Sequence, residues 1–212
     1  MAELLVRMRD EERALVPPGE FLPLFEEFGM MPQLDRWVVA HAARCLRRGS
    51  RIPLFTVNLS SQTLADPTFS AFVERELKAG TIAPASLAFE IDEADLATAF
   101  DGASVTASAL RLLGCGVLLD SFGCTSQSLV HLRHLRVDAV KLDGTIVRKA
   151  LLEGSARRLI DTVLRIAAAV EFQVIGACVE DQAVLLRLKA LGVAYAQGFG
   201  IHQPGPVEKV AG

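Results

Sequence analysis

The chain has 212 residues, 51% of them apolar, with 22 basic and 25 acidic side chains and a formal net charge of −3. A chain of this size buries enough surface to fold without disulfides, and its length favours a single domain, 1–212. The slight negative charge argues against a DNA or RNA partner and against attraction to an anionic membrane, because both need a basic face.

Short apolar runs predict seven strands, in chain order 2–6, 54–59, 87–91, 116–119, 139–142, 173–176 and 194–197. Apolar residues at helical spacing predict helices between them, over 19–29, 33–48, 70–80, 101–113, 126–134, 153–170 and 181–191. Strands that alternate with helices are typical of the α/β class, with parallel strands and crossover helices. Seven such strands indicate a barrel or a wide open sheet.

The cysteines and the N-terminus indicate where the protein works. No pair of the four cysteines has CxxC spacing, which fits a reduced protein without a structural zinc. The N-terminal residues carry charges where a signal peptide needs an apolar core, and no apolar run is long enough to span a membrane. We therefore expect a cytoplasmic protein with no membrane insertion.

Polar residues recur where the predicted strands end, which is where βα barrels place their chemistry. They are Glu3, Arg7, Asn58, Glu90, Glu93, Asp120, Lys141, Glu180 and Gln197. Four of them, Glu3, Asn58, Glu90 and Asp120, could converge as oxygen ligands of a hard divalent cation. Lys141 could neutralise a phosphate or orient a water. A single acidic residue at a strand end is often only a helix cap or a surface ion pair, but four in register with successive strands favour a site.

A series of segments in chain order carries a resemblance to a known family. They are AELLVR (2–7), PPGEFLPLFEEFGMM (17–31), LDRWVV (34–39), VNLS (57–60), FEIDEAD (89–95), LLDSFGCTSQSL (118–129), VDAVKLDGTIV (137–147), VIGACVED (174–181) and AQGFG (196–200). Together they resemble the EAL domain, the bacterial signalling domain that hydrolyses cyclic di-GMP. Among the family motifs matched are Glu-Ile-Thr-Glu, Asp-Asp-Phe-Gly and Ala-Glu-Gly-Val-Glu.

The resemblance implies a TIM-like (β/α)8 barrel of the EAL type. The family has a strand before the one that bears its first Glu, and residues 2–6 leave no room for it. We therefore expect a barrel that lacks the first strand and is truncated at its N-terminus relative to the family. Either the chain is a fragment of a longer protein, with an upstream sensor or partner domain, or the barrel is open along one seam. The resemblance also favours a homodimer, formed near the loop after Asp120.

The family mechanism implies a role for each matched residue. Two Mg²⁺ or Mn²⁺ ions activate a water and stabilise charge on the attacked phosphate, and the product is pGpG. The implied metal ligands are Glu3, Asn58, Glu90 and Asp120, and the implied catalytic residues are Lys141 and Glu3. Arg7 would grip a phosphate, and Glu93 would brace the loop after Asp120. The other implied ligand contacts are Asp35, Glu180, Gln197 and Pro204.

Two departures from the family pattern bear on activity. Ser121 stands where the family has the second Asp of Asp-Asp-Phe-Gly, and Ala177 stands where it has the Glu of Ala-Glu-Gly-Val-Glu. Both lost carboxylates belong to the side of the second metal, so one metal site at best is expected. Their loss should cost several kcal/mol of transition-state stabilisation, with about 1.4 kcal/mol per tenfold in rate.

Three functions follow from these departures. The first is a degenerate EAL domain that binds cyclic di-GMP, as a receptor, with little or no hydrolysis. The second is an active metal-dependent phosphodiesterase in which a water or Cys178 replaces the lost ligands, although thiolates suit softer metals than Mg²⁺. The third is a protein-interaction module that binds no nucleotide.

Overall fold

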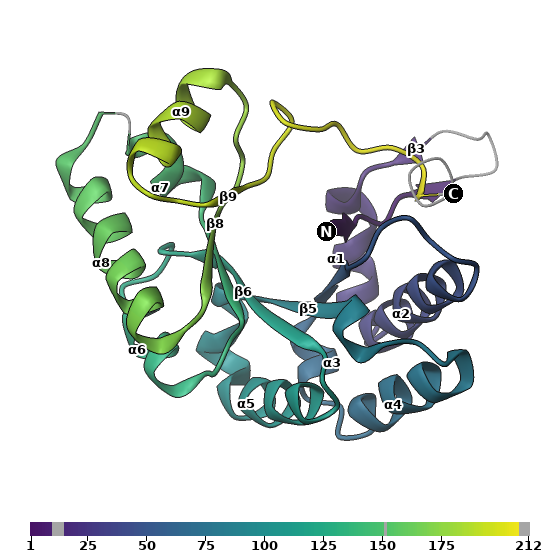
Figure 1. The fold of residues 1–212 in the computed structure, drawn as a ribbon. Coiled ribbons are helices and arrows are strands. Elements are labelled where there is room, and N and C mark those ends of the chain that lie inside the picture. The colour runs from purple at the N-terminus through teal and green to yellow at the C-terminus, as the bar shows by residue number, and fades with distance from the viewer. Residues whose placement is uncertain (10–14, 151, 208–212) are drawn as a thin grey trace. The chain divides into compact units, whose positions relative to one another are not determined.

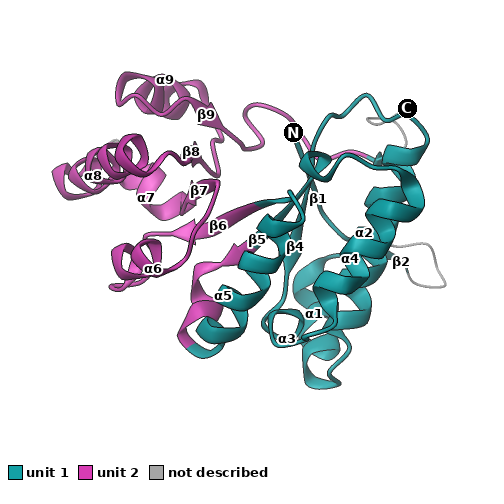
Figure 2. Ribbon diagram, turned by 60° about the horizontal axis from the view of Figure 1, so that its bottom comes forward, with its two compact units in different colours: residues 1–90, 98–116, 206–212 teal, residues 91–97, 117–205 magenta. Residues whose placement is uncertain are grey.

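Most strands of the described residues are followed by one or two helices (Figure 1). The computed structural model describes residues 1–9, 15–150 and 152–207. Their contacts divide into two compact units (Figure 2). Unit 1 comprises 1–90, 98–116 and 206–212, and unit 2 comprises 91–97 and 117–205. The organisation as one domain over 1–212 stays a prediction.

The described residues form one sheet of seven strands, as predicted. In hydrogen-bonded order the strands are β1 (Ala2–Leu4), β4 (Phe55–Leu59), β5 (Leu87–Asp92), β6 (Gly116–Phe122), β7 (Ala139–Leu142), β8 (Gln173–Gly176) and β9 (Tyr195–Ala196). In unit 1, β1 pairs with β4 in parallel, and in unit 2 the pairs β6–β7, β7–β8 and β8–β9 are parallel. A two-stranded antiparallel sheet, β2 (Met8–Arg9) with β3 (Leu15–Val16), is an addition that the sequence did not predict.

All the predicted helices are present. The α-helices are α1 (Pro18–Glu27), α2 (Met31–Arg47), α3 (Ser61–Leu64), α4 (Phe69–Gly80), α5 (Leu96–Leu112), α6 (Ser128–His134), α7 (Gly144–Lys149), α8 (Gly154–Val170) and α9 (Gln182–Ala190). Two 3-10 turns, η1 (Pro84–Ser86) and η2 (Glu93–Asp95), flank β5. The short helices α3 and α7 were not predicted. Within the described ranges, no helix combines the length and apolarity needed to cross a membrane.

The core of unit 1 lies between β4 and its helices. Helices α2 and α4 lie side by side (Figure 2). On β4, Phe55 and Val57 are fully buried, and Val39 and Ala42 of α2 are fully buried as well. Burying an apolar side chain of Val or Phe size is worth roughly 1.5–3 kcal/mol. Asn58 is the exposed residue of β4, so its side-chain amide can contact other polar groups of the sheet.

In unit 2 the central strand β7 is buried on both faces. Its four residues, Ala139 to Leu142, are all buried, which is typical of a parallel strand covered by helices. Helix α8 lies on one side of β8 (Figure 1) and buries Ile160 and Val163. Lys141 is the charged residue of this otherwise apolar strand, and it is 3% exposed.

A buried carboxylate ties α2 to α3 in unit 1. Asp35 on α2 is 5% exposed. Its Oδ2 accepts hydrogen bonds from the backbone N–H of Ser60 (2.9 Å), the Ser60 hydroxyl (2.8 Å) and the Thr63 hydroxyl (2.6 Å). Ser60 in turn caps α3, since its Oγ accepts from the N–H of Thr63. Burial raises the pKa of Asp35 above its ordinary 3.8, although these hydrogen bonds act to lower it.

The raised pKa of Asp35 predicts a pH dependence of stability. Between pH 3.8 and the higher pKa of the folded state, the folded chain binds more protons at Asp35 than the unfolded chain. The contribution of Asp35 to the free energy of unfolding is therefore largest at low pH and falls as the pH rises through this window. We expect Asp35→Asn to remove this component, as measured by urea denaturation at a series of pH values from about 4 upward.

Two further variants test this prediction, one as a control and one that removes the acceptor. Asp161→Asn changes an exposed carboxylate of α8 and should keep the wild-type pH profile. Asp35→Ala leaves the donors of Ser60 and Thr63 without their acceptor and should cost roughly 1–3 kcal/mol at pH 7. Identical pH profiles for the wild type and Asp35→Asn would show that Asp35 ionises normally.

Candidate functional site

In unit 1, three neighbouring strands each carry one oxygen-bearing side chain of the predicted metal site. Glu3 lies on β1, Asn58 on β4 and Glu90 on β5. Asn58 Nδ2 donates to Glu3 Oε1 at 2.9 Å, which leaves the amide oxygen of Asn58 as a donor to a metal. A carboxylate oxygen of Glu3 lies within 4.8 Å of one of Glu90, whose side chain is fully buried. Carboxylate and amide oxygens are the ligands that hard cations prefer, so this donor set fits Mg²⁺ or Mn²⁺.

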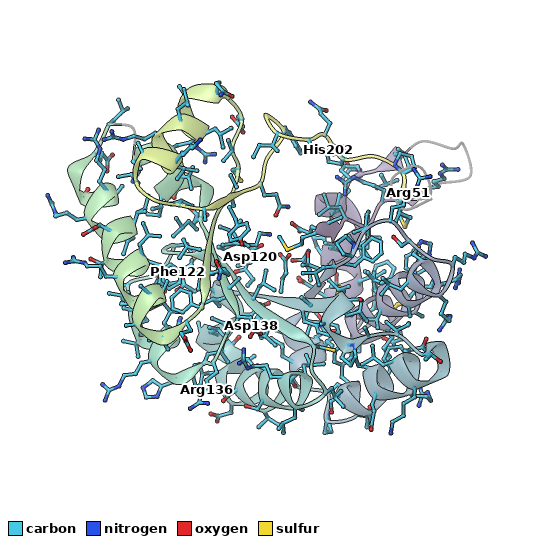
Figure 3. The ribbon with its side chains drawn as sticks, viewed as in Figure 1. Arg51, Asp120, Phe122, Arg136, Asp138 and His202 are labelled. Atoms are coloured by element: carbon cyan, nitrogen blue, oxygen red, sulfur yellow. The ribbon has the colours of Figure 1, made fainter. Side chains whose placement is uncertain are left out.

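In unit 2, Asp120 of β6 pairs with Lys141 of β7. Lys141 Nζ lies 3.0 Å from Asp120 Oδ2. The Asp120 Oδ1 accepts the backbone N–H of Ser121 at 2.7 Å. A second acidic residue of the strand pair, Asp138, lies at its opposite end, where Oδ2 accepts the N–H of Val117 (Figure 3). Asp120 is thus the carboxylate at the carboxyl end of β6.

A bulge in β6 sets the direction of Ser121. Leu119 pairs with Val140 and Phe122 with Leu142, so two residues of β6 oppose Lys141 alone. Ser121 has φ of +55°, a left-handed conformation that Asp and Asn tolerate better than most residues. Its hydroxyl donates to Asp92 Oδ2, at the end of β5, at 2.8 Å. The hydroxyl is therefore committed to a neighbouring carboxylate.

Glu93 contacts the loop that follows Asp120. The Glu93 side chain is fully buried. Its Oε2 accepts the N–H of Gly123 (3.1 Å), the thiol of Cys124 (3.3 Å) and the N–H of Thr125 (3.3 Å). Its Oε1 lies 3.4 Å from Nδ1 of the buried His131 on α6. A buried carboxylate needs such partners because a bare buried charge costs several kcal/mol.

Cys124 is poorly suited to act as a thiolate ligand. Burial, followed by its hydrogen bond to Glu93 and the negative charges of Glu93, Asp92 and Asp143, raises the pKa of its thiol to about 12. At neutral pH the sulfur carries its proton, and only the thiolate is an effective metal ligand. Cys124 therefore acts as a hydrogen-bond donor inside the loop.

The segment after β8 holds the second departure from the family pattern. Ala177 presents a methyl group, and its N–H donates to the carbonyl of Leu142 at 3.4 Å. Cys178 packs against the start of α7, where a Cβ on Gly144 would lie 2.8 Å from the sulfur. Glycine at 144 is what allows this approach, so the Cys178 side chain is directed toward α7.

Glu180 and Gln197 lie on two segments that are joined through their backbones. Val179 N–H donates to the carbonyl of Gln197 at 3.0 Å, and Gln197 N–H donates to the carbonyl of Gly176 at 2.9 Å. A Cβ on Gly198 would lie 2.2 Å from the backbone of Val179, so only glycine fits there. The AQGFG segment thus needs its glycine for packing, and it holds Gln197 beside the segment of the exposed Glu180.

The other predicted ligand contacts lie outside these groups. Arg7 is exposed, and its Nη1 donates to the carbonyl of Val6 at 2.8 Å. Asp35 uses Oδ2 within unit 1, and Pro204 is exposed. Their roles toward a ligand stay predictions. The sequence analysis did not single out Asp92, which accepts the Ser121 hydroxyl and stands where the matched motif has Thr.

The contacts of Glu93 predict the effect of its removal. Glu93→Ala leaves the N–H groups of Gly123 and Thr125 without their acceptor, and we expect a loss of roughly 3 kcal/mol in the free energy of unfolding. Amide hydrogen exchange should become faster at these two residues. Glu74→Ala, on the exposed face of α4, should change stability by less than about 0.5 kcal/mol. Unchanged exchange at Gly123 and Thr125 in Glu93→Ala would contradict the bracing role.

A model of the EAL domain family matches residues 1–204 of the chain. Among curated proteins, the chain is 28% identical over 208 residues to the cyclic di-GMP phosphodiesterase PdeF of Escherichia coli K12. It is 31% identical over 207 residues to the cyclic di-GMP phosphodiesterase PdeR of the same organism. These matches cover 97% and 96% of the chain but only 28% and 31% of the relatives, so the chain spans less than a third of their length.

Solved structures agree with this match. The EAL domain of FimX from Pseudomonas aeruginosa, bound to cyclic di-GMP, has a TM-score of 0.89 and 30% identity, over 96% of this chain and 83% of that one. The PaMucR phosphodiesterase in complex with cyclic di-GMP has a TM-score of 0.88 and 26% identity, over 98% and 86%. The predicted fold class, the (β/α)8 fold of the EAL type without its first strand, is confirmed. The chain belongs to the EAL domain family.

Proposed function

We propose that this chain is a degenerate EAL domain that binds cyclic di-GMP with little or no hydrolysis. The observation that carries the proposal is the chemistry at positions 121 and 177. Ala177 offers a methyl group, and the Ser121 hydroxyl donates to Asp92. Neither residue brings the negative charge that the matched motifs supply at these positions, and a neutral group cannot offset a divalent cation there.

The groups that would recognise the ligand are retained. Arg7 is exposed and can present its guanidinium to a phosphate in a bidentate manner. Glu180 and Gln197 lie on adjoining segments of unit 2 and would contact a guanine together with Asp35 and Pro204. A receptor needs these contacts, whereas it does not need the arrangement that activates a water.

One Mg²⁺ or Mn²⁺ is part of the proposal. Glu3, Asn58, Glu90 and Asp120 would hold it, and it would supply positive charge against a phosphate of the dinucleotide. Lys141 donates to Asp120 and would add a second positive charge beside that phosphate. The proposed role also includes a cytoplasmic location, a homodimer and an upstream sensor or partner domain.

Calorimetric titration with cyclic di-GMP, with and without Mg²⁺ or Mn²⁺, tests this function. We expect saturable binding, and no release of pGpG when the mixture is separated by chromatography. Arg7→Ala should weaken binding about tenfold or more, because a charge-assisted hydrogen bond is worth roughly 1.5–3 kcal/mol. Arg9→Ala removes a nearby exposed arginine and should leave the affinity unchanged.

Two results would contradict the receptor function. Release of pGpG at ordinary enzymatic rates, about 1–10³ per second, would show an active phosphodiesterase. Absence of binding at every cation concentration would instead indicate a module that acts through protein contacts.

A further inference from the structure

Unit 1 contains a cavity at the opposite end of β4 from Asn58. Its volume is about 340 Å³, and its lining residues all lie between positions 46 and 86, within unit 1. They come from the end of α2, from Pro53 just before β4, and from the segment that runs from the end of α4 to η1. Asn58 lies near the carboxyl end of β4, so the cavity is separate from the predicted metal site. Ligand cavities typically have volumes of about 300–1,000 Å³, so this one can hold a small organic molecule.

The walls of the cavity combine hydrogen-bond donors with apolar surface. The donors are a guanidinium and three hydroxyl groups, those of Arg47, Ser50, Thr81 and Ser86. Apolar surface comes from Ile52 and Pro53. Among the described residues, no acidic side chain lines the cavity. Guanidinium and hydroxyl groups donate to anionic oxygens, so these walls favour an anion with an organic part over a cation.

Arg47 lies where it can bind such an anion. A Cβ on Gly80 would lie 2.9 Å from Cγ of Arg47, so glycine at position 80 lets the Arg47 side chain lie across the end of α4. Nη1 of Arg47 is 3.6 Å from Oε2 of Glu76, which is longer than a hydrogen bond, and the Arg47 side chain is 35% exposed. Because a guanidinium carries several N–H donors, this long ion pair leaves donors for a phosphate.

The positive charge beside the cavity exceeds what the end of α2 requires. Residues 44–51 include four arginines and no acidic residue, in a chain whose net charge is −3. Arg44 and Arg47 lie in the last turn of α2, where the helix dipole favours positive side chains. The helix end and Glu76 together supply about one and a half negative charges, fewer than the arginines carry. Such an excess of positive charge attracts anions.

Thr81 adopts a backbone conformation that costs stability. It follows α4 directly, with φ of +50° and ψ of +41°. After four other helices the left-handed residue is a glycine, namely Gly29, Gly49, Gly114 and Gly192. A β-branched residue at positive φ is strained, and such strain is often found at binding sites. Threonine at a position that suits glycine therefore supports a role for its hydroxyl group in the cavity.

We propose that this cavity binds a small phosphate monoester. Arg47 holds the phosphate group by charge-assisted hydrogen bonds, and the three hydroxyl groups donate to its other oxygens. The organic part of the ligand lies against Ile52 and Pro53. This site goes beyond the proposed function and does not depend on it, because its residues lie at the other end of β4 from the predicted metal site.

Titration of the whole chain with phenyl phosphate, followed by ¹H–¹⁵N NMR spectra, tests the proposal, with sodium chloride at the same ionic strength as the reference. We expect saturable shifts of the backbone amides of Ser50, Thr81 and Ser86, and weaker binding of inorganic phosphate, which lacks the apolar part. Arg47→Gln should lower the affinity about tenfold or more, because it removes a charge-assisted hydrogen bond. Arg165→Gln, on an exposed part of α8 in unit 2, should bind phenyl phosphate as the wild type does.

Thr81→Gly separates ligand binding from folding. Glycine adopts the left-handed conformation without strain, so this variant should unfold at a higher temperature than the wild type. It should also bind phenyl phosphate about threefold or more weakly, because it lacks the hydroxyl group. Wild-type affinity in an Arg47→Gln variant that thermal unfolding shows to be folded would overturn the proposal, as would shifts confined to amides outside the cavity. Unchanged affinity in Thr81→Gly would overturn the role of its hydroxyl group.

Discussion

Burial of charge is the constraint on which the rest of this structure depends. Among the described residues, four acidic or basic side chains are at most 5% exposed, namely Asp35, Glu90, Glu93 and Lys141. An unpaired charge in such a place costs several kcal/mol, so the surrounding chain must provide partners. Asp35 is offset by hydroxyl and backbone donors, Glu93 by the loop 123–125 and Lys141 by Asp120. The local structure at the strand ends follows from these pairings.

The same constraint explains why the loop after β6 keeps its shape although its sequence departs from the family. Glu93 accepts backbone N–H groups of Gly123 and Thr125, and these groups do not depend on side-chain identity. The loop can therefore accept Cys124 without losing its anchor. The substitutions at positions 121 and 177 and the retention of the fold are thus independent, because different atoms are involved in each.

Periodicity predicted the seven strands of the sheet and the long helices, since apolar spacing reports directly which face is buried. It missed the short antiparallel pair β2–β3 and the helices α3 and α7, which are too short for a periodic signal. It placed the end of α4 at Gly80, where the structure has it, but it did not predict the left-handed conformation of the next residue, Thr81, with φ of +50°. Such local backbone conformations depend on packing rather than on the pattern of apolar residues.

The site was predictable to the extent that it follows strand order. Five strands each carry one of these residues: Glu3 is the middle residue of β1, and Asn58, Glu90, Asp120 and Lys141 lie one or two residues before the last residue of β4, β5, β6 and β7. The bulge in β6 could not be predicted, because it depends on register between β6 and β7, which a single sequence does not reveal. Because the bulge sets the direction of Ser121, the hydrogen bond from Ser121 to Asp92 could not be predicted from the sequence either.

That bond changes how the loss at position 121 should be understood. Considered alone, Ser for Asp removes a negative charge from the loop and predicts a weaker cation site. Considered with Asp92, the pair carries the same charge as the Thr and Asp of the matched motifs. Electrostatic attraction for a cation depends chiefly on that total charge, whereas hydrolysis depends on where each ligand stands to within a fraction of an ångström. The exchange therefore keeps the total charge of the pair and changes only the position of the carboxylate. Ala177 has no such compensation in the contacts of its own segment, so the two departures differ in kind.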